Sequence, residues 1–150
     1  MVTTGSTAGG PRDHLHAVLA SAGARLIIDS VRVRPGHPML MAELADGRRL
    51  VGLPGNPLAA VSGLLTLVAP AVHALAGRAP APARTTVLAA AVKGHPRDVR
   101  LVPVSAGTAL HYVGPAMLRG LAAADALAVV PPGGAAAGDT IEVLALPWTG

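Results

Sequence analysis

The stretch Gly52-Leu53-Pro54-Gly55-Asn56-Pro57 combines residue types that could hold a negatively charged group. The apolar run Leu50–Leu53 predicts a short buried strand. Pro54 and Gly55 would end that strand, because proline has no backbone N–H and glycine tolerates positive φ angles. The negatively charged group would therefore bind at the carboxyl end of a strand.

A helix is predicted to follow this turn at once. Asn56 is a good N-cap, Pro57 suits the first helical position, and the chain then stays apolar over residues 58–76. Unpaired N–H groups and the positive end of the helix dipole suit a phosphate or oxyanion at such an N-terminus. An ordinary strand-to-helix turn without a ligand has the same pattern.

A second candidate site is the small-residue loop Thr4-Gly5-Ser6-Thr7-Ala8-Gly9-Gly10, followed by Asp13. Glycines let a ligand approach the backbone, and hydroxyl and N–H groups can bind phosphate. The loop matches neither a Walker motif nor a dinucleotide fingerprint. Asp13 also suits the N-cap of the next helix, so a purely structural turn is the alternative interpretation.

A third candidate is the basic segment around Pro35-Gly36, with Arg32, Arg34 and His37. Two arginines at alternate positions of a strand point to the same face and could clamp an oxyanion. A solvated strand edge would show the same residues.

Composition narrows the range of partners. The chain has 150 residues, a formal net charge of +4, no cysteine and 1% aromatic residues. A basic balance favours an anionic ligand, but nucleic acid is not expected without dense Lys/Arg runs or stacking aromatics. The absence of cysteine excludes disulfides and thiolate metal sites, and is compatible with a reducing cytoplasm.

No membrane association is expected. Pro70 and His73 interrupt the longest apolar stretch, and a membrane-spanning helix needs about 18 or more apolar residues. No cationic leader precedes an apolar run at the start of the sequence. We therefore expect a cytoplasmic protein.

The elements that would position these loops form two groups, an α/β group followed by a β-rich group. The first is predicted to contain strands at 1–4, 25–33, 39–44 and 48–53, a helix after Asp13, a hairpin turn at Asp46-Gly47, and a helix from Asn56 that kinks near Pro70. Residues 79–84 are predicted to be a linker. The second is predicted to contain strands at 86–92, 100–104, 109–113, 126–130 and 140–146, with a loop at 133–138.

The order of the three candidate segments resembles the molybdopterin molybdenumtransferase family, which includes the MoeA-type proteins and the C-terminal domain of gephyrin. The matching segments are Thr3-Thr4-Gly5-Ser6-Thr7-Ala8-Gly9-Gly10-Pro11-Arg12-Asp13, Arg34-Pro35-Gly36-His37-Pro38 and Leu53-Pro54-Gly55-Asn56-Pro57. The resemblance implies that residues 1–78 are the C-terminal half of a three-layer pterin-binding α/β domain. It also implies that residues 85–147 form a small β-barrel-like domain.

The resemblance further implies a late step of molybdenum cofactor synthesis. Such an enzyme inserts molybdate into adenylylated molybdopterin with the help of Mg²⁺, releases AMP, and is a homodimer at full length. Asp13 would be the catalytic residue and Mg²⁺ ligand. The substrate-binding residues would be Thr4, Gly5, Ser6, Gly10, Arg34, Pro35, Gly36, His37, Pro54, Gly55, Asn56, Pro57 and Arg100, with Arg34, His37 and Arg100 supplying positive charge for molybdate.

Several positions depart from the family pattern. Ser6 stands for a glycine, Ala8 and Ala59 for serines, His37 for a lysine and Pro115 for a polar residue. These changes affect molybdate binding more than pterin binding. Two alternatives therefore stay open, a non-catalytic pterin-binding or scaffold module and an inactive gene fragment. The family has further domains before this segment, so we expect residues 1–78 to be incomplete as a fold and to expose apolar surface.

Overall fold

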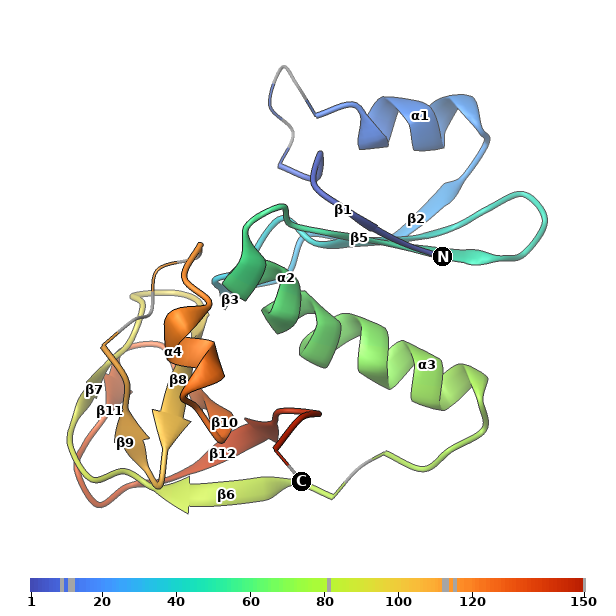
Figure 1. Cartoon of the computed structure of the whole chain (residues 1–150). Coiled ribbons are helices and arrows are strands. Elements are labelled where there is room, and N and C mark those ends of the chain that lie inside the picture. Colours follow the sequence, from blue (N-terminus) through green and yellow to red (C-terminus); the bar gives the residue numbers. More distant parts are fainter. Residues whose placement is uncertain (9, 11–12, 81, 112–113, 115, 150) are drawn as a thin grey trace. The chain divides into compact units, whose positions relative to one another are not determined.

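The computed structural model describes every residue except 9, 11–12, 81, 112–113, 115 and 150. The chain forms two compact units (Figure 1). The first comprises Met1–Val31 and Gly36–Arg78, and the second comprises Arg32–Pro35 and Ala79–Gly150. A four-residue segment from the middle of the first half of the chain thus belongs to the second unit. Pro115, one of the departures from the family pattern, lies outside the described residues.

The first unit is built on a four-stranded sheet with the strand order β1-β5-β4-β2. Its strands are β1 Val2–Thr4, β5 Arg49–Leu53, β4 Leu40–Glu43 and β2 Arg25–Asp29. β1 runs parallel to β5, whereas β4 pairs antiparallel with both of its neighbours. The predicted hairpin between β4 and β5 is present, and Gly47 adopts the left-handed backbone (φ 82°) that the turn requires.

Helices cover both faces of this sheet. Helix α1 (Leu15–Ser21) lies on one side of the sheet in Figure 1, and the helix formed by α2 (Pro57–Gly63), the π-helical segment η1 (Leu64–Val68) and α3 (Ala69–Leu75) lies on the other. Glycines allow the close approach on both sides. A Cβ on Gly52 would lie 2.7 Å from Cδ2 of Leu15, and a Cβ on Gly63 would lie 2.6 Å from Cδ2 of Leu53. The unit therefore has three layers.

Two local predictions for the first unit are wrong, and a third, an irregularity of the long helix near Pro70, is confirmed. The strand expected at 25–33 ends at Asp29, because Ser30 takes a positive φ of 89° and turns the chain. Asp13 does not cap α1, since His14 occupies the N-cap position without a side-chain hydrogen bond. The irregularity expected near Pro70 lies at η1, just before it. Proline cannot donate a hydrogen bond to the carbonyl four residues earlier, which favours a wider turn there.

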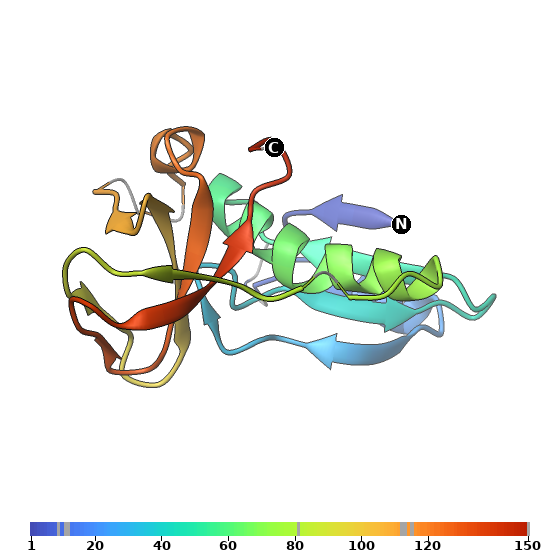
Figure 2. The same ribbon diagram turned by 90° about the horizontal axis from the view of Figure 1, so that it is seen from below.

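The second unit contains a curved sheet with the order β3-β8-β10-β12-β6 (Figure 2). The strands are β3 Val33–Arg34, β8 Val99–Ser105, β10 Ala126–Val130, β12 Thr140–Ala145 and β6 Arg84–Val87; β9 Thr108–Ala109 pairs with β8, β7 Val92–Lys93 pairs with β11 Gly134–Ala135, and α4 spans Arg119–Ala122. Its core consists of aliphatic side chains such as Leu88, Val102 and Ile141, as expected for a sequence without phenylalanine.

The predicted strand at 126–130 is correct to the residue. The strand predicted at 86–92 is two short strands, β6 and β7, and the predicted loop at 133–138 contains β11. The strand predicted at 109–113 is the two-residue strand β9, and residues 112–113 lie outside the described residues. The errors at 86–92 and 133–138 concern Gly- and Ala-rich segments, in which pairing with a distant strand decides the conformation.

The helix over Pro57–Leu75, with 19 residues, is long and apolar enough by composition to cross a membrane. Core helices of soluble proteins meet the same criterion. In this helix Leu58, Ala59, Ser62 and Gly63 are buried. The length and composition of one helix are therefore weak evidence for a membrane, and the absence of a membrane partner stays a prediction.

Candidate functional site

Two of the three predicted loops meet at the carboxyl end of β1 and β5. The parallel register pairs Thr4 with Leu53, so both strands end at the same edge of the sheet. The backbone N–H of Gly5 donates a 2.8 Å hydrogen bond to the carbonyl oxygen of Leu53. A Cβ on Gly55 would lie 3.5 Å from the Cα of Gly5. Segments about fifty residues apart in the sequence thus form one continuous backbone surface.

The left-handed backbone in this surface lies in the first loop. Gly5 and Ser6 have φ angles of 86° and 55°. Gly55 is not among the residues with positive φ, so the expectation that its turn needs such an angle is wrong. The absence of a side chain at Gly55 instead serves the close approach to Gly5. β5 ends at Leu53, directly before Pro54, as predicted.

Asn56 occupies the N-cap position of α2 with extended backbone angles (φ −74°, ψ 129°), and Pro57 lies in the first turn. The Asn56 side chain makes no capping hydrogen bond. Its backbone carbonyl accepts the N–H of Ala60 over 2.8 Å, which begins the helix. N–H groups of the first turn, such as that of Leu58, have no acceptor within the helix. They lie on the chain directly after the contact between Gly55 and Gly5.

Asp13 is tied to Gly10 in a tight turn. Its Oδ2 accepts the N–H of Gly10 over 2.8 Å, and its own N–H donates to the Gly10 carbonyl over the same distance. In the described part of the chain, no group of three or more His, Cys, Asp or Glu side chains could hold a metal ion. Magnesium is often held by one or two carboxylates together with phosphate and water. Asp13 therefore fits one ligand of a shared site, not a complete metal site.

The hydroxyl residues of the first loop differ in their exposure to solvent. Thr4 and Ser6 are exposed, whereas Thr7 is buried and its Cγ2 would lie 3.0 Å from a Cβ on Gly52. Thr4 and Ser6 are therefore the hydroxyls of this loop that are accessible to a ligand.

In the first unit His37 follows Gly36, which has a φ of 122°. Nδ1 of His37 lies 2.7 Å from the carbonyl oxygen of Val31. A carbonyl can only accept, so Nδ1 carries a proton and donates. This bond fixes the imidazole and leaves Nε2 as the atom that could face a ligand.

Arg34 and Arg32 both contact Asp98 within the second unit. Nε of Arg34 donates to Oδ2 of Asp98 over 2.9 Å, and Nε of Arg32 lies 3.5 Å from Oδ1. The two arginines do share a face, and the anion they clamp here is a carboxylate of the same chain. Pro35, joined to Arg34 by a cis peptide bond, belongs to the same unit.

Arg100 lies beside Arg34 in this unit, because the parallel pairing of β3 and β8 sets the two residues opposite each other. Its Nη1 donates to the carbonyl oxygen of Lys93 over 2.7 Å. The sequence-predicted residues therefore form two groups, one in each unit. Sequence reasoning missed Asp98, because its arginine partners Arg32 and Arg34 lie far from it in the sequence.

The hydrogen bond from Arg34 holds the pKa of Asp98 below its usual value, with further help from the charge of Arg34 and from the contact with Arg32. An aspartate with a lowered pKa stabilises the fold above the unfolded-state value of 3.8 and loses that contribution as pH falls through the folded-state value. We expect Asp98→Asn, which cannot take up this proton, to lose stability less steeply than the parent below about pH 4. Urea unfolding midpoints measured between about pH 3 and pH 6 would test this, and parallel curves for the two proteins would contradict it.

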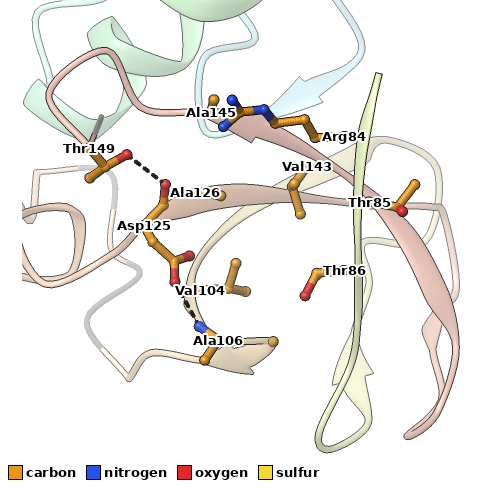
Figure 3. A pocket seen from close by; sticks show the side chains of 11 residues that line it. Arg84, Thr85, Thr86, Val104, Ala106, Asp125, Ala126, Val143, Ala145 and Thr149 are labelled. Atoms are coloured by element: carbon orange, nitrogen blue, oxygen red, sulfur yellow. Dashed lines mark hydrogen bonds between the residues drawn. The ribbon is translucent and has the colours of Figure 1, made fainter. Parts of the chain in front are cut away.

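A cavity of about 270 Å³ lies in the second unit and contains none of the predicted site residues (Figure 3). Its lining residues are Arg84, Thr85, Thr86, Val104, Ala106, Gly107, Asp125, Ala126, Val143, Ala145 and Thr149. Figure 3 shows hydrogen bonds that join three of these residues, Asp125, Ala106 and Thr149. Oδ2 of Asp125 accepts the N–H of Ala106 over 2.8 Å, and Oγ1 of Thr149 donates to the Asp125 carbonyl over 3.0 Å. These bonds give Asp125 a structural role.

Comparison with known protein families assigns each unit separately. Residues 1–74 match the family described as "Probable molybdopterin binding domain", and residues 80–146 match "MoeA C-terminal region (domain IV)". An α/β molybdopterin-binding unit followed by a small β unit is the class that the fold and its loops define. The chain belongs to the MoeA-type molybdopterin molybdenumtransferase family and corresponds to a C-terminal portion of it.

Curated relatives carry the name molybdopterin molybdenumtransferase. One from Staphylococcus epidermidis is 39% identical over 77 residues, covering 51% of this chain and 18% of that protein. One from Nostoc sp. is 35% identical over 81 residues, covering 53% of this chain and 19% of that protein. The chain thus spans about a fifth of the length of these relatives.

Solved structures support the fold. The molybdopterin biosynthesis moeA protein from Pyrococcus horikosii matches with a TM-score of 0.73 at 20% identity, covering 96% of this chain and 36% of that chain. The molybdenum cofactor biosynthesis protein from Pyrococcus furiosus matches with a TM-score of 0.70 at 20% identity, covering 90% of this chain and 55% of that chain. The predicted fold class, a partial pterin-binding α/β domain followed by a small β domain, is confirmed.

Proposed function

We propose that this chain is part of a molybdopterin molybdenumtransferase that inserts molybdate into adenylylated molybdopterin and releases AMP. In this proposal residues 1–78 are the C-terminal half of the pterin-binding domain, residues 79–84 a linker, and residues 85–147 the small β domain. The name of the curated relatives supports the reaction. Because the chain spans 18% of the length of one of them, we assign it a part of the binding surface.

The observation that carries the proposal is the contact between the loops after β1 and β5. Gly5 and Gly55 approach each other at the end of two parallel strands, beside the N-terminus of α2. Open backbone at such an edge offers N–H groups to a phosphate without competing side chains. We assign the phosphate group of the pterin to this surface, with Thr4, Ser6 and Gly10 on the first loop and Pro54, Asn56 and Pro57 on the second.

The other roles follow from charge. Arg34, Arg100 and His37, with Pro35 and Gly36 shaping their loop, would attract molybdate. Asp13 would be one oxygen ligand of a Mg²⁺ ion, and that ion would neutralise phosphate charge. We further propose a cytoplasmic protein that acts as a homodimer at full length, with a small-molecule partner and no nucleic acid.

A second candidate function is a pterin-binding module without catalysis. Two observations favour it. Arg34 is engaged by Asp98 and Arg100 by the Lys93 carbonyl, so neither guanidinium is wholly available to molybdate. Ala59, which replaces the serine of the family pattern, is a buried residue that offers no hydroxyl.

Asp13→Asn tests the metal role. Asparagine can still accept the N–H of Gly10, so the free energy of unfolding should change by less than about 1 kcal/mol. We expect the variant to bind adenylylated molybdopterin as the parent does without Mg²⁺, but to lose about tenfold in the affinity that added Mg²⁺ contributes. Calorimetric titration with and without Mg²⁺ measures both. Equal enhancement by Mg²⁺ in the two proteins would exclude Asp13 as a ligand.

A further inference from the structure

We propose that Asp98 is a positioning residue that presents the guanidinium of Arg34 to an oxyanion. The inference rests on the proposed function, because it needs Arg34 to bind an anion. It assigns a role to Asp98, which belongs to the second unit, as Arg34 does, but lies 64 positions from Arg34 in the sequence.

The first step is the geometry of the arginine. Asp98 contacts Arg34 only through Nε, the inner edge of the guanidinium, over 2.9 Å. The Asp98 side chain is 10% exposed and the Arg34 side chain 48% exposed. In the described part of the chain no hydrogen bond engages the two Nη groups of Arg34. A carboxylate bound at Nε fixes the orientation of the guanidinium. The two Nη groups then stay available to bind an oxyanion through two parallel hydrogen bonds.

The second step is that Asp98 is itself held in place. Nδ1 of His95 accepts the backbone N–H of Asp98 over 3.0 Å and that of Arg97 over 3.3 Å. Because this nitrogen accepts, it carries no proton in this arrangement, and its 3.5 Å approach to Oδ2 of Asp98 is not a hydrogen bond. Arg32 holds the other side of the carboxylate through its 3.5 Å contact with Oδ1. The backbone of Asp98 is thus held by His95, and its buried carboxylate contacts Arg32, before any ligand arrives.

The third step concerns what such a site would bind. Arg34 and Arg100 are register partners on β3 and β8, so their side chains leave the same face of the parallel pair. Two guanidinium groups on one face, one of them with open Nη groups, suit a small tetrahedral oxyanion. Molybdate is a suitable probe of this chemistry.

The sign of the effect separates positioning from competition. If Asp98 merely competes with the ligand for Arg34, removing its negative charge should tighten anion binding, by up to about threefold for charges some 7 Å apart in water. If Asp98 positions Arg34, the freed side chain must be ordered on binding, which weakens binding by roughly tenfold. We expect positioning to dominate, giving Asp98→Asn an affinity about fivefold weaker at about 0.15 M salt. The deficit should grow at higher salt, because screening removes the opposing charge effect.

The experiment is calorimetric titration of the 150-residue chain with sodium molybdate. The variants are Asp98→Asn, Arg34→Ala and the double substitution. Asp139→Asn is the control, because Asp139 is another aspartate of this unit whose Oδ2 accepts a hydrogen bond, in its case from the backbone N–H of Ala136 over 2.7 Å. Urea unfolding of each variant identifies losses that come from misfolding. We expect Asp98→Asn to weaken binding in the parent but not in the Arg34→Ala background, and Asp139→Asn to bind as the parent does.

Unchanged or tighter binding by Asp98→Asn, with Arg34→Ala still weakened, would overturn the positioning role alone. An equal loss in Asp139→Asn would also overturn it, because the effect would then follow general destabilisation. Parent-like affinity in Arg34→Ala would overturn both this role and the assignment of Arg34 to molybdate.

Discussion

Replacing Gly55 with valine is expected to weaken binding of adenylylated molybdopterin by at least about tenfold and to destabilise the fold by about 1–3 kcal/mol. A Cβ at this position would lie 3.5 Å from the Cα of Gly5, which is an ordinary contact. The γ carbons of valine extend beyond the Cβ, and a γ carbon directed at Gly5 would push apart the loops that follow β1 and β5. They would also cover the backbone N–H groups that we assign to the phosphate.

Gly55→Ala is the matched control. It adds only the Cβ, and Gly55 does not have the positive φ that would strain an alanine. We expect near-parent stability and an affinity within about threefold of the parent. Titration with adenylylated molybdopterin and urea unfolding of both variants provide the comparison. Parent-like affinity in Gly55→Val, in a protein that remains folded, would leave the loop as an ordinary strand-to-helix connection.

Gly107→Ala is expected to destabilise the second unit by about 3 kcal/mol or more. A Cβ on Gly107 would lie 2.1 Å from the carbonyl oxygen of Val87, and its φ is 77°. Its own carbonyl accepts the N–H of Ala89 over 3.0 Å, which joins the turn after β8 to the segment after β6. The conflict is with backbone, so no side-chain rotation can relieve it.

Gly138→Ala is the control that separates the cost of a left-handed backbone from the cost of the clash with Val87. Gly138 has a similar φ of 87°, but a Cβ there would meet nothing within 4 Å. We expect it to cost about 1 kcal/mol, the cost of a left-handed backbone alone. Urea unfolding, with hydrogen exchange of amides in β8 and β10, measures both variants. Equal losses would show that the backbone conformation dominates and that the contact with Val87 relaxes.

Local rules predicted the elements whose ends are set by their own residues. Asp46-Gly47 defined the hairpin, Pro54 ended β5, and Asn56 with Pro57 began a helix, because turn and cap preferences depend on a few neighbouring residues.

The failures have a different origin. A strand over 25–33 was plausible from its apolar content, but Ser30 turns the chain and Val33 pairs with Val99. Asp13 suited an N-cap, yet its carboxylate bonds Gly10 instead. Asp98 could not be assigned to Arg34, since nothing in the local sequence specifies a contact between residues so far apart. Tertiary pairing decided the first and the last of these cases, whereas Asp13 bonds Gly10 within its own loop.

The pairing of β3 with β8 has a practical consequence for dissecting the protein. Val33 is 4% exposed, and the N–H of Val99 donates to the carbonyl of Arg32 over 3.1 Å. Residues 79–150 expressed alone would therefore lack an edge strand that the intact unit contains. The backbone N–H and C=O groups of β8 that pair with β3 would then be left unpaired. For the same reason, a protease cut within residues 79–83 should leave two fragments that still elute together from a sizing column, because β3 lies on the first fragment and pairs with β8 on the second.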